Sequence, residues 1–244
     1  MPLKGKTVFI TGGTGGIGRP LVRMLEKAGA AVTVYSQKNQ GDLAEMKDHI
    51  CASLRARTPD ILINMAGFNV FDYCERQDLE HIVALNMMVP LRLSQAVLPA
   101  MKTRGSGHIV NVGSMTAVIP LPHLTGYVAA KAGLKGFTDS LRRELAGTGI
   151  AVTHIVPRAV RTGMNSGARA EINEKTGVAY DDPETVAALI FRAIERKEKE
   201  VRIGWPERLF ALIQAVCPAI IDIGLQKNRR AGEAILRRHS STNA

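Results

Sequence analysis

Short apolar runs alternate with segments of helical periodicity along most of the chain. Such runs are typical of strands buried in a parallel sheet, and the periodic segments are typical of the helices that connect those strands. The predicted strands are Lys6–Thr11, Ala31–Tyr35, Asp60–Asn64, His108–Gly113, Ile150–Val156 and Val201–Ile203. Because crossovers between parallel strands are right-handed, this order predicts the α/β class with a single-domain, doubly wound parallel sheet.

The segments between these runs predict the helices. They are Ile17–Gly29, a helix capped by Asp42 that reaches Leu54, Asp78–Arg104, Leu124–Thr148 and 182–199. Pro90 and Pro99 are expected to bend the longest of them. Asp182 followed by Pro183 is typical of a helix start, with the aspartate as N-cap and the proline at the first helical position.

Two features depart from the usual pattern of such a sheet. Between Tyr35 and Asp60 there is room for one helix but hardly for a further strand, so the third strand should be short or missing. After the last predicted strand, residues 205–244 remain. We expect them to form a helical C-terminal extension of a domain that spans residues 1–204.

Composition limits the class of protein further. The chain has 244 residues, of which 45% are hydrophobic, and this is enough for one large core. Cys51, Cys74 and Cys217 show no metal-ligand spacing, so we expect buried free thiols in a reducing cytosol and no metal site. The first residues lack the apolar segment of a signal peptide. These features favour a cytoplasmic protein.

A net charge of +10 restricts the class of partner. Nucleic acid, an anionic membrane surface, an acidic carrier protein and a phosphorylated cofactor would each complement it. Nucleic acid is disfavoured, because the chain has no recognition motif and only 5% aromatic residues on which bases could stack.

A glycine-rich stretch, Thr11–Gly18, follows the first predicted strand and opens a helix. Glycines let backbone amides approach a pyrophosphate, and a helix N-terminus favours its negative charge. A dinucleotide site is therefore favoured over a merely tight turn. The predicted cofactor contacts in this loop are Gly12, Thr14, Gly15, Gly16, Ile17 and Gly18.

The end of the second strand usually decides between the two nicotinamide cofactors. An acid there would bind a ribose 2′-hydroxyl and repel a 2′-phosphate. The chain has no acid at this point and offers the hydroxyl of Ser36 and the cation of Lys38. NADP (NADPH) is therefore favoured over NAD. Two observations oppose this preference for NADP. Lys38 could instead be a solvated loop lysine, and no basic residue directly precedes Gly16.

A second set of polar residues lies in and after the later strands. Tyr127 and Lys131 form a Tyr-x-x-x-Lys motif on a predicted helix, and positions four residues apart share one helix face. Ser114 follows the strand that precedes this helix, and Asn86 lies on the long helix before that strand.

Together with Asn64–Gly67 and the TGxxxGxG pattern of the first loop, these motifs resemble the short-chain dehydrogenase/reductase family over about residues 5–205. The resemblance implies a Rossmann-like, NADP(H)-dependent oxidoreductase that interconverts a ketone and a secondary alcohol. It implies Tyr127 as proton donor or acceptor, with a pKa lowered by Lys131. It assigns the substrate oxygen to Ser114, and to Asn86 a water that relays protons. Further implied cofactor contacts are Asp42, Asn64, Ala66, Gly67, Tyr127, Lys131, Pro157, Val160 and Thr162.

The family resemblance also makes the apolar segment 118–124 a wall of the substrate pocket, with His123 as a rim or structural residue. The most similar group is the 3-oxoacyl-carrier-protein reductases, which implies an apolar carbonyl substrate, free or bound to a carrier protein or CoA. Arg158 stands where the family usually has glycine, and it either binds an anionic part of the substrate or forms an ion pair. Candidate contacts for an acidic carrier, or else solvated charges, are Arg142, Arg143, Arg158 and Arg161.

Three further predictions concern the loop that covers the site, the C-terminal extension and the oligomeric state. Residues Gly163–Asp181 are expected to cover the site. The apolar stretch 205–225 and the basic stretch 226–244 would pack on the protein's own core or a sister subunit, cap a long-chain pocket, or lie on an anionic membrane. The family's pairing of long helices predicts a homodimer or homotetramer. The rival functions are a membrane-associated lipid or steroid dehydrogenase and a non-catalytic NADP-binding regulator.

Overall fold

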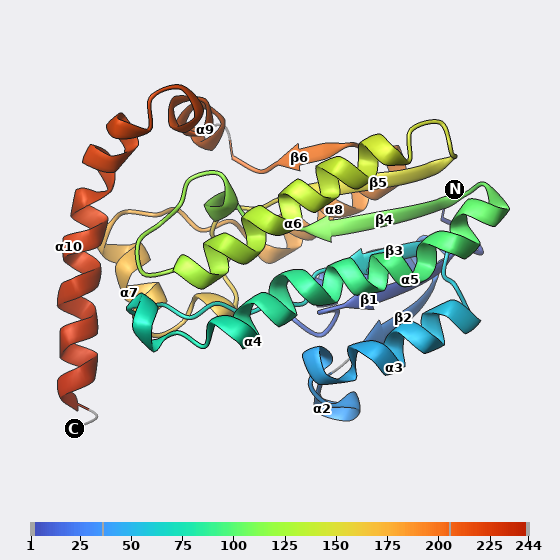
Figure 1. Ribbon diagram of the computed structural model, residues 1–244, viewed down its shortest axis with the longest axis horizontal. Helices are drawn as coiled ribbons and strands as arrows, with labels where there is room; N and C mark the ends of the chain where they lie inside the picture. The colour runs from blue at the N-terminus through green and yellow to red at the C-terminus, as the bar shows by residue number, and fades with distance from the viewer. Residues whose placement is uncertain (1–2, 36, 205, 243–244) are drawn as a thin grey trace.

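Figure 1 shows the computed structural model of the protein, which describes residues 3–35, 37–204 and 206–242. A six-stranded sheet has the order β2-β1-β3-β4-β5-β6, and every neighbouring pair is parallel. The doubly wound parallel sheet predicted from the sequence is confirmed. Its strands are β1 (Thr7–Thr11), β2 (Ala31–Tyr35), β3 (Ile61–Asn64), β4 (Gly107–Val112), β5 (Ile150–Val156) and β6 (Glu200–Arg202).

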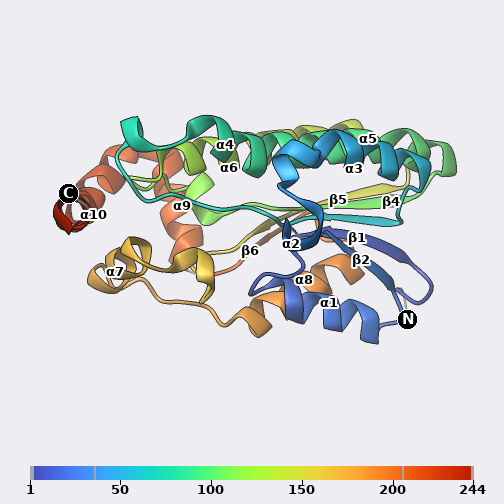
Figure 2. The same cartoon turned by 90° about the horizontal axis from the view of Figure 1, so that it is seen from below.

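Helices cover both faces of this sheet, as Figure 2 shows. One face carries α3 (Leu43–Ala56), α5 (Val89–Arg104) and α6 (Thr125–Glu144), and the other carries α1 (Gly18–Lys27) and α8 (Pro183–Arg196). Both layers bury large aliphatic side chains completely, among them Leu93 of α5 and Leu21 of α1. Since each such side chain contributes roughly 1.5–3 kcal/mol, the two layers hold the carboxyl ends of the strands in fixed positions.

The connection between β2 and β3 contains only the short helix α2 (Gln37–Gln40) and α3. β3 therefore pairs directly with β1, with Val8 opposite Ile61, and β2 is an edge strand on the other side of β1. The expectation of a short or missing third strand is confirmed, because no strand stands between α2 and α3 in the described chain.

The predicted helix Asp78–Arg104 is one helical stretch in three parts. α4 (Leu79–Val83) leads into a π-helical turn, Ala84–Met88, which leads into α5. Pro90 has no N–H to continue the regular hydrogen-bond ladder, whereas Pro99 lies inside α5 without ending it. Of the described helices, this stretch alone is long and apolar enough to cross a membrane, and it packs on α3 and β4.

The C-terminal extension is helical, as predicted. α9 (Pro206–Val216) and α10 (Pro218–Thr242) follow β6, and α10 stands across the end of the sheet toward which the strands point (Figure 1). There α10 packs on α7 (Ala168–Lys175), a helix within the segment predicted as a covering loop. Ile235 and Leu236 are buried, so the second half of α10 packs on the protein's own chain.

The first half of the extension is exposed. Large apolar side chains of α9 and early α10 are 49% to 76% exposed, and we call them the apolar elbow: Phe210, Leu212, Val216, Ile220 and Ile223. The extension is therefore divided between a docked half and an exposed half.

The cysteines differ from expectation. Cys51 of α3 is buried, but Cys74 and Cys217 are exposed. The prediction of burial is wrong for these two, because Cys74 lies in a short surface turn and Cys217 lies at the junction of α9 and α10 rather than in the core.

Candidate active site

The loop after β1 is built so that only glycine fits at several positions. Gly12 has a φ of +76°, and a Cβ there would lie 2.7 Å from the backbone N of Ala66. A Cβ at Gly16 would lie 2.6 Å from Cγ2 of Thr162. Residues that follow β1, β3 and β5 therefore meet at close range at the carboxyl ends of these strands.

A cavity of about 560 Å³ lies beside this loop. It is situated at the N-terminus of α1, where a helix favours negative charge. Together with the close approach at the glycines, this position fits the pyrophosphate of a dinucleotide. The predicted cofactor residues in its lining are Gly12, Gly15, Gly16, Ile17, Gly18, Ala66, Gly67 and Thr162.

A second cavity, of about 310 Å³, lies between Gly12 and the end of β2. Thr14, Tyr35 and Asp42 line it. The Asp42 carboxylate caps α3 by accepting a hydrogen bond from the backbone N of Ala44 at 2.7 Å. The adenosine part of a dinucleotide would lie in this cavity, and Asp42 is the acidic residue among those described in its lining.

Three predicted cofactor residues are not placed in a cavity. Ser36 lies outside the described residues, and Lys38 lies on α2, where its side chain is not described. Asn64 is buried, and its Nδ2 donates a hydrogen bond to Oδ1 of Asn111 at 2.8 Å. The Asn64 side chain therefore joins β3 to β4 instead of lining a cavity.

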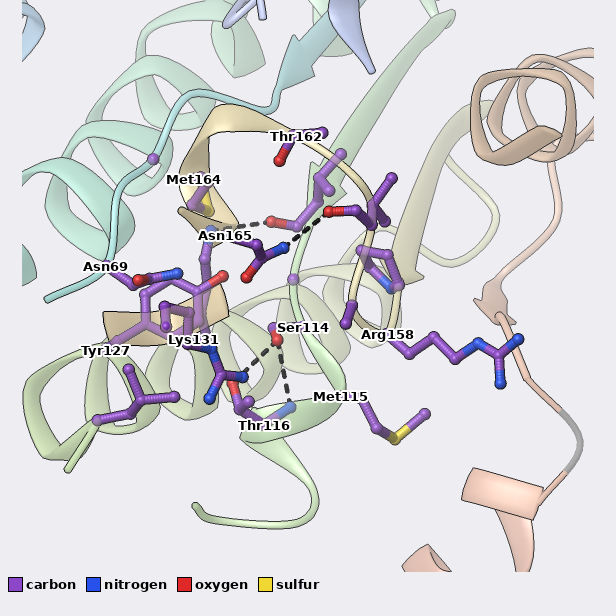
Figure 3. A pocket seen from close by; sticks show the side chains of 18 of the residues that line it. Asn69, Ser114, Met115, Thr116, Tyr127, Lys131, Arg158, Thr162, Met164 and Asn165 are labelled. Carbon is purple, nitrogen blue, oxygen red and sulfur yellow. Dashed lines mark hydrogen bonds between the residues drawn. The ribbon is translucent and has the colours of Figure 1, made fainter. Parts of the chain in front are cut away.

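The third cavity, of about 260 Å³, brings the predicted catalytic residues together (Figure 3). Ser114 follows β4, and Tyr127 and Lys131 face the same space from α6. The cavity shares Gly67 with the glycine-lined cavity, so the two spaces adjoin. The predicted contacts after β5 also line it: Pro157, Val160 and Thr162.

Tyr127 and Ser114 interact at the centre of this cavity. Burial raises the pKa of the Tyr127 phenol, while a hydrogen bond with Ser114 and the charge of Arg169 lower it. A cation lowers this pKa as expected, but the cation is Arg169 rather than Lys131, and the effect of burial is larger. Ser114 Oγ also accepts hydrogen bonds from the N and Oγ1 of Thr116, at 3.2 and 2.9 Å.

Lys131 is buried one helical turn beyond Tyr127. Its Nζ donates a hydrogen bond to the carbonyl oxygen of Val112 at 3.1 Å and lies 5.7 Å from the centroid of the Tyr127 ring. Burial lowers the pKa of this ammonium to about 8. The group is therefore still mostly charged at neutral pH, in a place where charge is disfavoured.

Asn86 lies in the π-helical turn and is completely buried. Its Nδ2 donates to the carbonyl oxygens of Phe68 and Ile82, both at 2.9 Å, whereas its Oδ1 has no partner among the described residues. A Cβ at Gly67 would lie 2.5 Å from this Oδ1 and 3.5 Å from Lys131 Nζ. The missing side chain at Gly67 thus leaves a gap between an acceptor and a donor, which suits a water molecule.

The rest of the third cavity is mostly apolar. Its apolar lining is Met115, Ile119, Leu121, Leu124, Met164 and Val178. His123 is absent from this lining, has a φ of +65°, and its ring lies 5.4 Å from that of Phe71. It is a structural residue at the edge of the site, one of the two roles expected for it.

Arg158 also lines this cavity, but it is engaged elsewhere. Its Nε and Nη2 donate to the two carboxylate oxygens of Asp181 at 2.9 and 2.7 Å. Of the two roles predicted for Arg158, the ion pair is the one present. Among the other candidate contacts for a carrier, Arg142 pairs with an aspartate of its own helix, and Arg143 and Arg161 are exposed.

Arg169 is the site residue that the sequence reasoning missed. It lies on α7, is only 9% exposed, and lines both the third cavity and the glycine-lined cavity. No motif marks it. The signal that was available is its helical spacing from Ile172 and Asn173, which are buried on the same helix.

Comparison with known families and proteins agrees with this geometry. The family model described as short chain dehydrogenase matches residues 6–59 and 52–173. The two matched segments meet in α3, the long helix of the shortened connection between β2 and β3.

Two curated proteins and one solved structure illustrate the similarity. Ketoacyl reductase HetN of Nostoc sp. is 31% identical over 231 residues, covering 83% of this chain and 79% of that protein. The 3-oxoacyl-[acyl-carrier-protein] reductase FabG of Vibrio harveyi is 31% identical over 224 residues, covering 79% of this chain and 91% of that protein. An NAD(P) dependent gluconate 5-dehydrogenase structure from Beutenbergia cavernae, with bound NADP at low occupancy, superimposes with a TM-score of 0.73 at 25% identity, covering 83% and 96% of the two chains.

Proposed function

Because the chain belongs to the short chain dehydrogenase family of oxidoreductases, we propose that it interconverts a ketone and a secondary alcohol with NADP(H). The observation that carries this proposal is the meeting of Ser114, Tyr127 and Lys131 in one cavity that adjoins the glycine-lined cavity. A reacting carbon and a nicotinamide would meet where the two cavities share Gly67 and Thr162.

The described residues fit such a cofactor. Side chains at Gly12 or Gly16 would fill the space beside the loop, and the helix N-terminus suits a pyrophosphate. Thr162, in van der Waals reach of Gly16, is placed to contact the nicotinamide end. When bound, the cofactor supplies or accepts a hydride.

In this proposal Tyr127 Oη gives a proton to the substrate carbonyl oxygen during reduction and takes a proton from the alcohol during oxidation. Ser114 Oγ donates a hydrogen bond to the same oxygen and stabilises the charge that develops there. Lys131 Nζ hydrogen-bonds the nicotinamide ribose, and a water between Lys131 and Asn86 Oδ1 exchanges the proton with solvent, supplying it during reduction and removing it during oxidation. The charge of Lys131 is favourable for these tasks, although its burial is costly for the fold.

The preference for NADP over NAD rests on the end of β2 and on one relative. No acid lies at residues 35–38, and Asp42, the acid in the adenosine-side cavity, is occupied by the N-terminus of α3. The Beutenbergia cavernae protein binds NADP. Fluorescence titration with NADPH and NADH tests this preference, and tighter binding of NADH would contradict it.

The substrate in this proposal is an apolar carbonyl compound, free or attached to a carrier protein or CoA. The apolar wall of the third cavity supports this class, and two relatives are named as ketoacyl reductases. The test is NADPH oxidation in the presence of β-ketoacyl thioesters, steroids and quinones. Absence of turnover with every ketone, together with tight NADPH binding, would favour a non-catalytic regulator.

A membrane-associated lipid or steroid dehydrogenase is the second candidate, and the apolar elbow favours it. Five large apolar side chains are exposed at the junction of α9 and α10, and the basic residues Lys227, Arg229 and Arg230 follow. Co-sedimentation with anionic liposomes tests this candidate, with Ile223→Asp as the variant expected to lose binding. A homodimer or homotetramer remains a proposal, for which sedimentation at several protein concentrations is the test.

A further inference from the structure

Arg169 holds a buried positive charge that nothing in the described chain neutralises. The side chain is 9% exposed, and its Nε has no hydrogen-bond partner. Of the acids on and next to α7, Glu174 is exposed, and two others are engaged by other cations. Glu171 pairs with Arg238 and with Lys175, and Asp181 pairs with Arg158.

The titratable groups that act on the Arg169 guanidinium are two tyrosines. Burial lowers the pKa of Arg169, and Tyr127 and Tyr180 raise it. Tyr180 Oη accepts a hydrogen bond from Nδ2 of Asn173. No carboxylate takes part, so the guanidinium remains charged beside the reaction centre without a counterion.

A buried arginine without an anion costs the folded state several kcal/mol, because the charge loses its hydration and gains no partner. Arginine cannot avoid this cost by losing its proton, since its pKa is far above neutral. Its planar fork of N–H groups matches the two oxygens of a carboxylate or of a phosphate. An anionic ligand in the third cavity would supply the missing partner.

We propose that Arg169 binds a carboxylate or phosphate group of the substrate, so that the natural substrate is an anionic ketone or alcohol. This inference rests on the proposed function and makes its substrate class more specific. The apolar lining accommodates the carbon chain, and Ser114 with Tyr127 receives the carbonyl group. Of the described cations in this lining, Lys131 is assigned to the proton relay and Arg158 is paired with Asp181. Arg169 is then the cation that can fix which end of the substrate enters first.

Substrate is one of two sources of such an anion, because Arg169 also lines the cavity assigned to the cofactor. Its place in the lining of the third cavity, which Tyr127 also lines, favours the substrate. Arg169 is close enough to Tyr127 to lower the pKa of its hydroxyl, and Tyr127 is the residue that touches the substrate oxygen in the proposed reaction.

The experiment compares keto carboxylates of increasing chain length with their methyl esters, for example levulinate and methyl levulinate. The proteins are the wild type, Arg169→Met, Arg169→Lys and the control Arg192→Met, which removes an exposed arginine of α8. Arg169→Met should lower kcat/KM for the acids about tenfold to a hundredfold, the usual range for a charge-assisted hydrogen bond. The esters should change by no more than a few fold, Arg169→Lys should restore part of the activity on acids, and the control should match the wild type.

A binding arm separates this inference from the proposed function. Binding of acid and ester to the NADPH complex of Tyr127→Phe is measured by calorimetry, which requires no turnover. Preference for the acid that disappears in the double variant Tyr127→Phe/Arg169→Met supports the role of Arg169 even if no ketone is reduced. Arg169→Met should also raise the melting temperature, because an unpaired buried charge is replaced by an apolar side chain of similar length.

Three results would overturn the inference. The wild type binds none of the carboxylates, or binds each ester as well as its acid. Arg169→Met lowers activity on acids and esters equally. Arg169→Met weakens NADPH binding by the same factor as it lowers kcat/KM, which would assign the cation to a phosphate of the cofactor.

Discussion

The two sides of the candidate active site are built in different ways. Ser114 follows β4, and Tyr127 and Lys131 belong to α6; both elements are packed in the layers of the sheet. Arg169 belongs to α7, and the main support of α7 is the C-terminal helix α10. The side that carries the proton chemistry therefore depends on the core, while the side that carries the unpaired cation depends on the extension. This difference separates the variants that should abolish the reaction from those that should change its substrate or its stability.

The largest effect is expected at the core side. Tyr127→Phe removes the proton donor and keeps the packing of the ring, so kcat should fall by about a thousandfold or more, within or above the usual contribution of general acid catalysis. Binding of NADPH should stay within a few fold, as followed by fluorescence titration. Residual activity above about a tenth of the wild type would remove Tyr127 from this role.

The docked and exposed halves of the extension should differ in their contribution to stability, and two variants of α10 test this. Ile235 is completely buried and Ile223 is 70% exposed. Ile235→Ala should lower the free energy of unfolding by about 2–4 kcal/mol, whereas Ile223→Ala should change it by less than about 0.5 kcal/mol. Urea denaturation measures both.

The same pair tests whether α10 supports the substrate side. Ile235→Ala should raise KM for the substrate more than it weakens NADPH binding. The reason is that α7, which carries Arg169, packs on α10, whereas the glycine loop leads into α1 of the core. Equal losses of stability in the two variants would contradict the division into a docked and an exposed half.

On the core side, the buried charge of Lys131 should lower the free energy of unfolding of the protein. The pKa of its ammonium falls from 10.5 in the unfolded chain to about 8 in the folded protein, so below pH 8 the folded state bears the cost of a buried charge. The shift corresponds to about 3 kcal/mol, and the lost hydrogen bond to Val112 offsets part of it. Lys131→Met should therefore abolish activity and raise the free energy of unfolding at pH 7 by about 2 kcal/mol.

The pH dependence checks the sign of this effect. The free energy of unfolding of the wild type should increase as pH rises from about 8 toward 10.5, because in this range the unfolded chain keeps the Lys131 proton that the folded protein has lost. Lys131→Met should lack this increase. Lys102→Met, at an exposed lysine, is the control and should change the unfolding free energy by less than about 0.5 kcal/mol. A destabilised Lys131→Met protein at pH 7 would contradict the prediction.

The smallest effect links the two sides. Arg169 lowers the pKa of the Tyr127 phenol and burial raises it. Removing the cation in Arg169→Met should therefore move the rising limb of the pH–rate profile for alcohol oxidation to higher pH. Oxidation needs the Tyr127 phenolate as base. The measurement is kcat for a neutral alcohol against pH, with Arg192→Met as control. An unshifted limb would show that the two groups act independently.

Much of the core side could be predicted from the sequence. The strands follow from apolar runs, and the glycine loop, Ser114 and the Tyr-x-x-x-Lys motif follow from the requirements of their chemistry. The missing strand also follows from a length too short to hold it. These features are local in the sequence, and so a pattern can record them.

The substrate side could not be predicted in the same way. The segment of α7 was expected to be a loop, since Gly163, Gly167 and Gly177 surround it, and nothing local marks Arg169 as buried. The helix that carries it packs on α10, which is far along the chain. The orientation of Asn64 toward Asn111 and the exposure of Cys74 and Cys217 likewise depend on neighbours that sequence spacing does not reveal.

The ion pair of Glu171 with Arg238 and its contact with His239 have a consequence for how the molecule is made. A ribosome synthesises the sheet, the glycine loop and the catalytic motif before the partners of Glu171. The substrate side is therefore the later of the two sides to receive its support. The two ends of the chain lie at opposite ends of the molecule (Figure 1). An affinity tag fused to the C-terminus adjoins these ion pairs, whereas a tag fused to the N-terminus leaves them untouched.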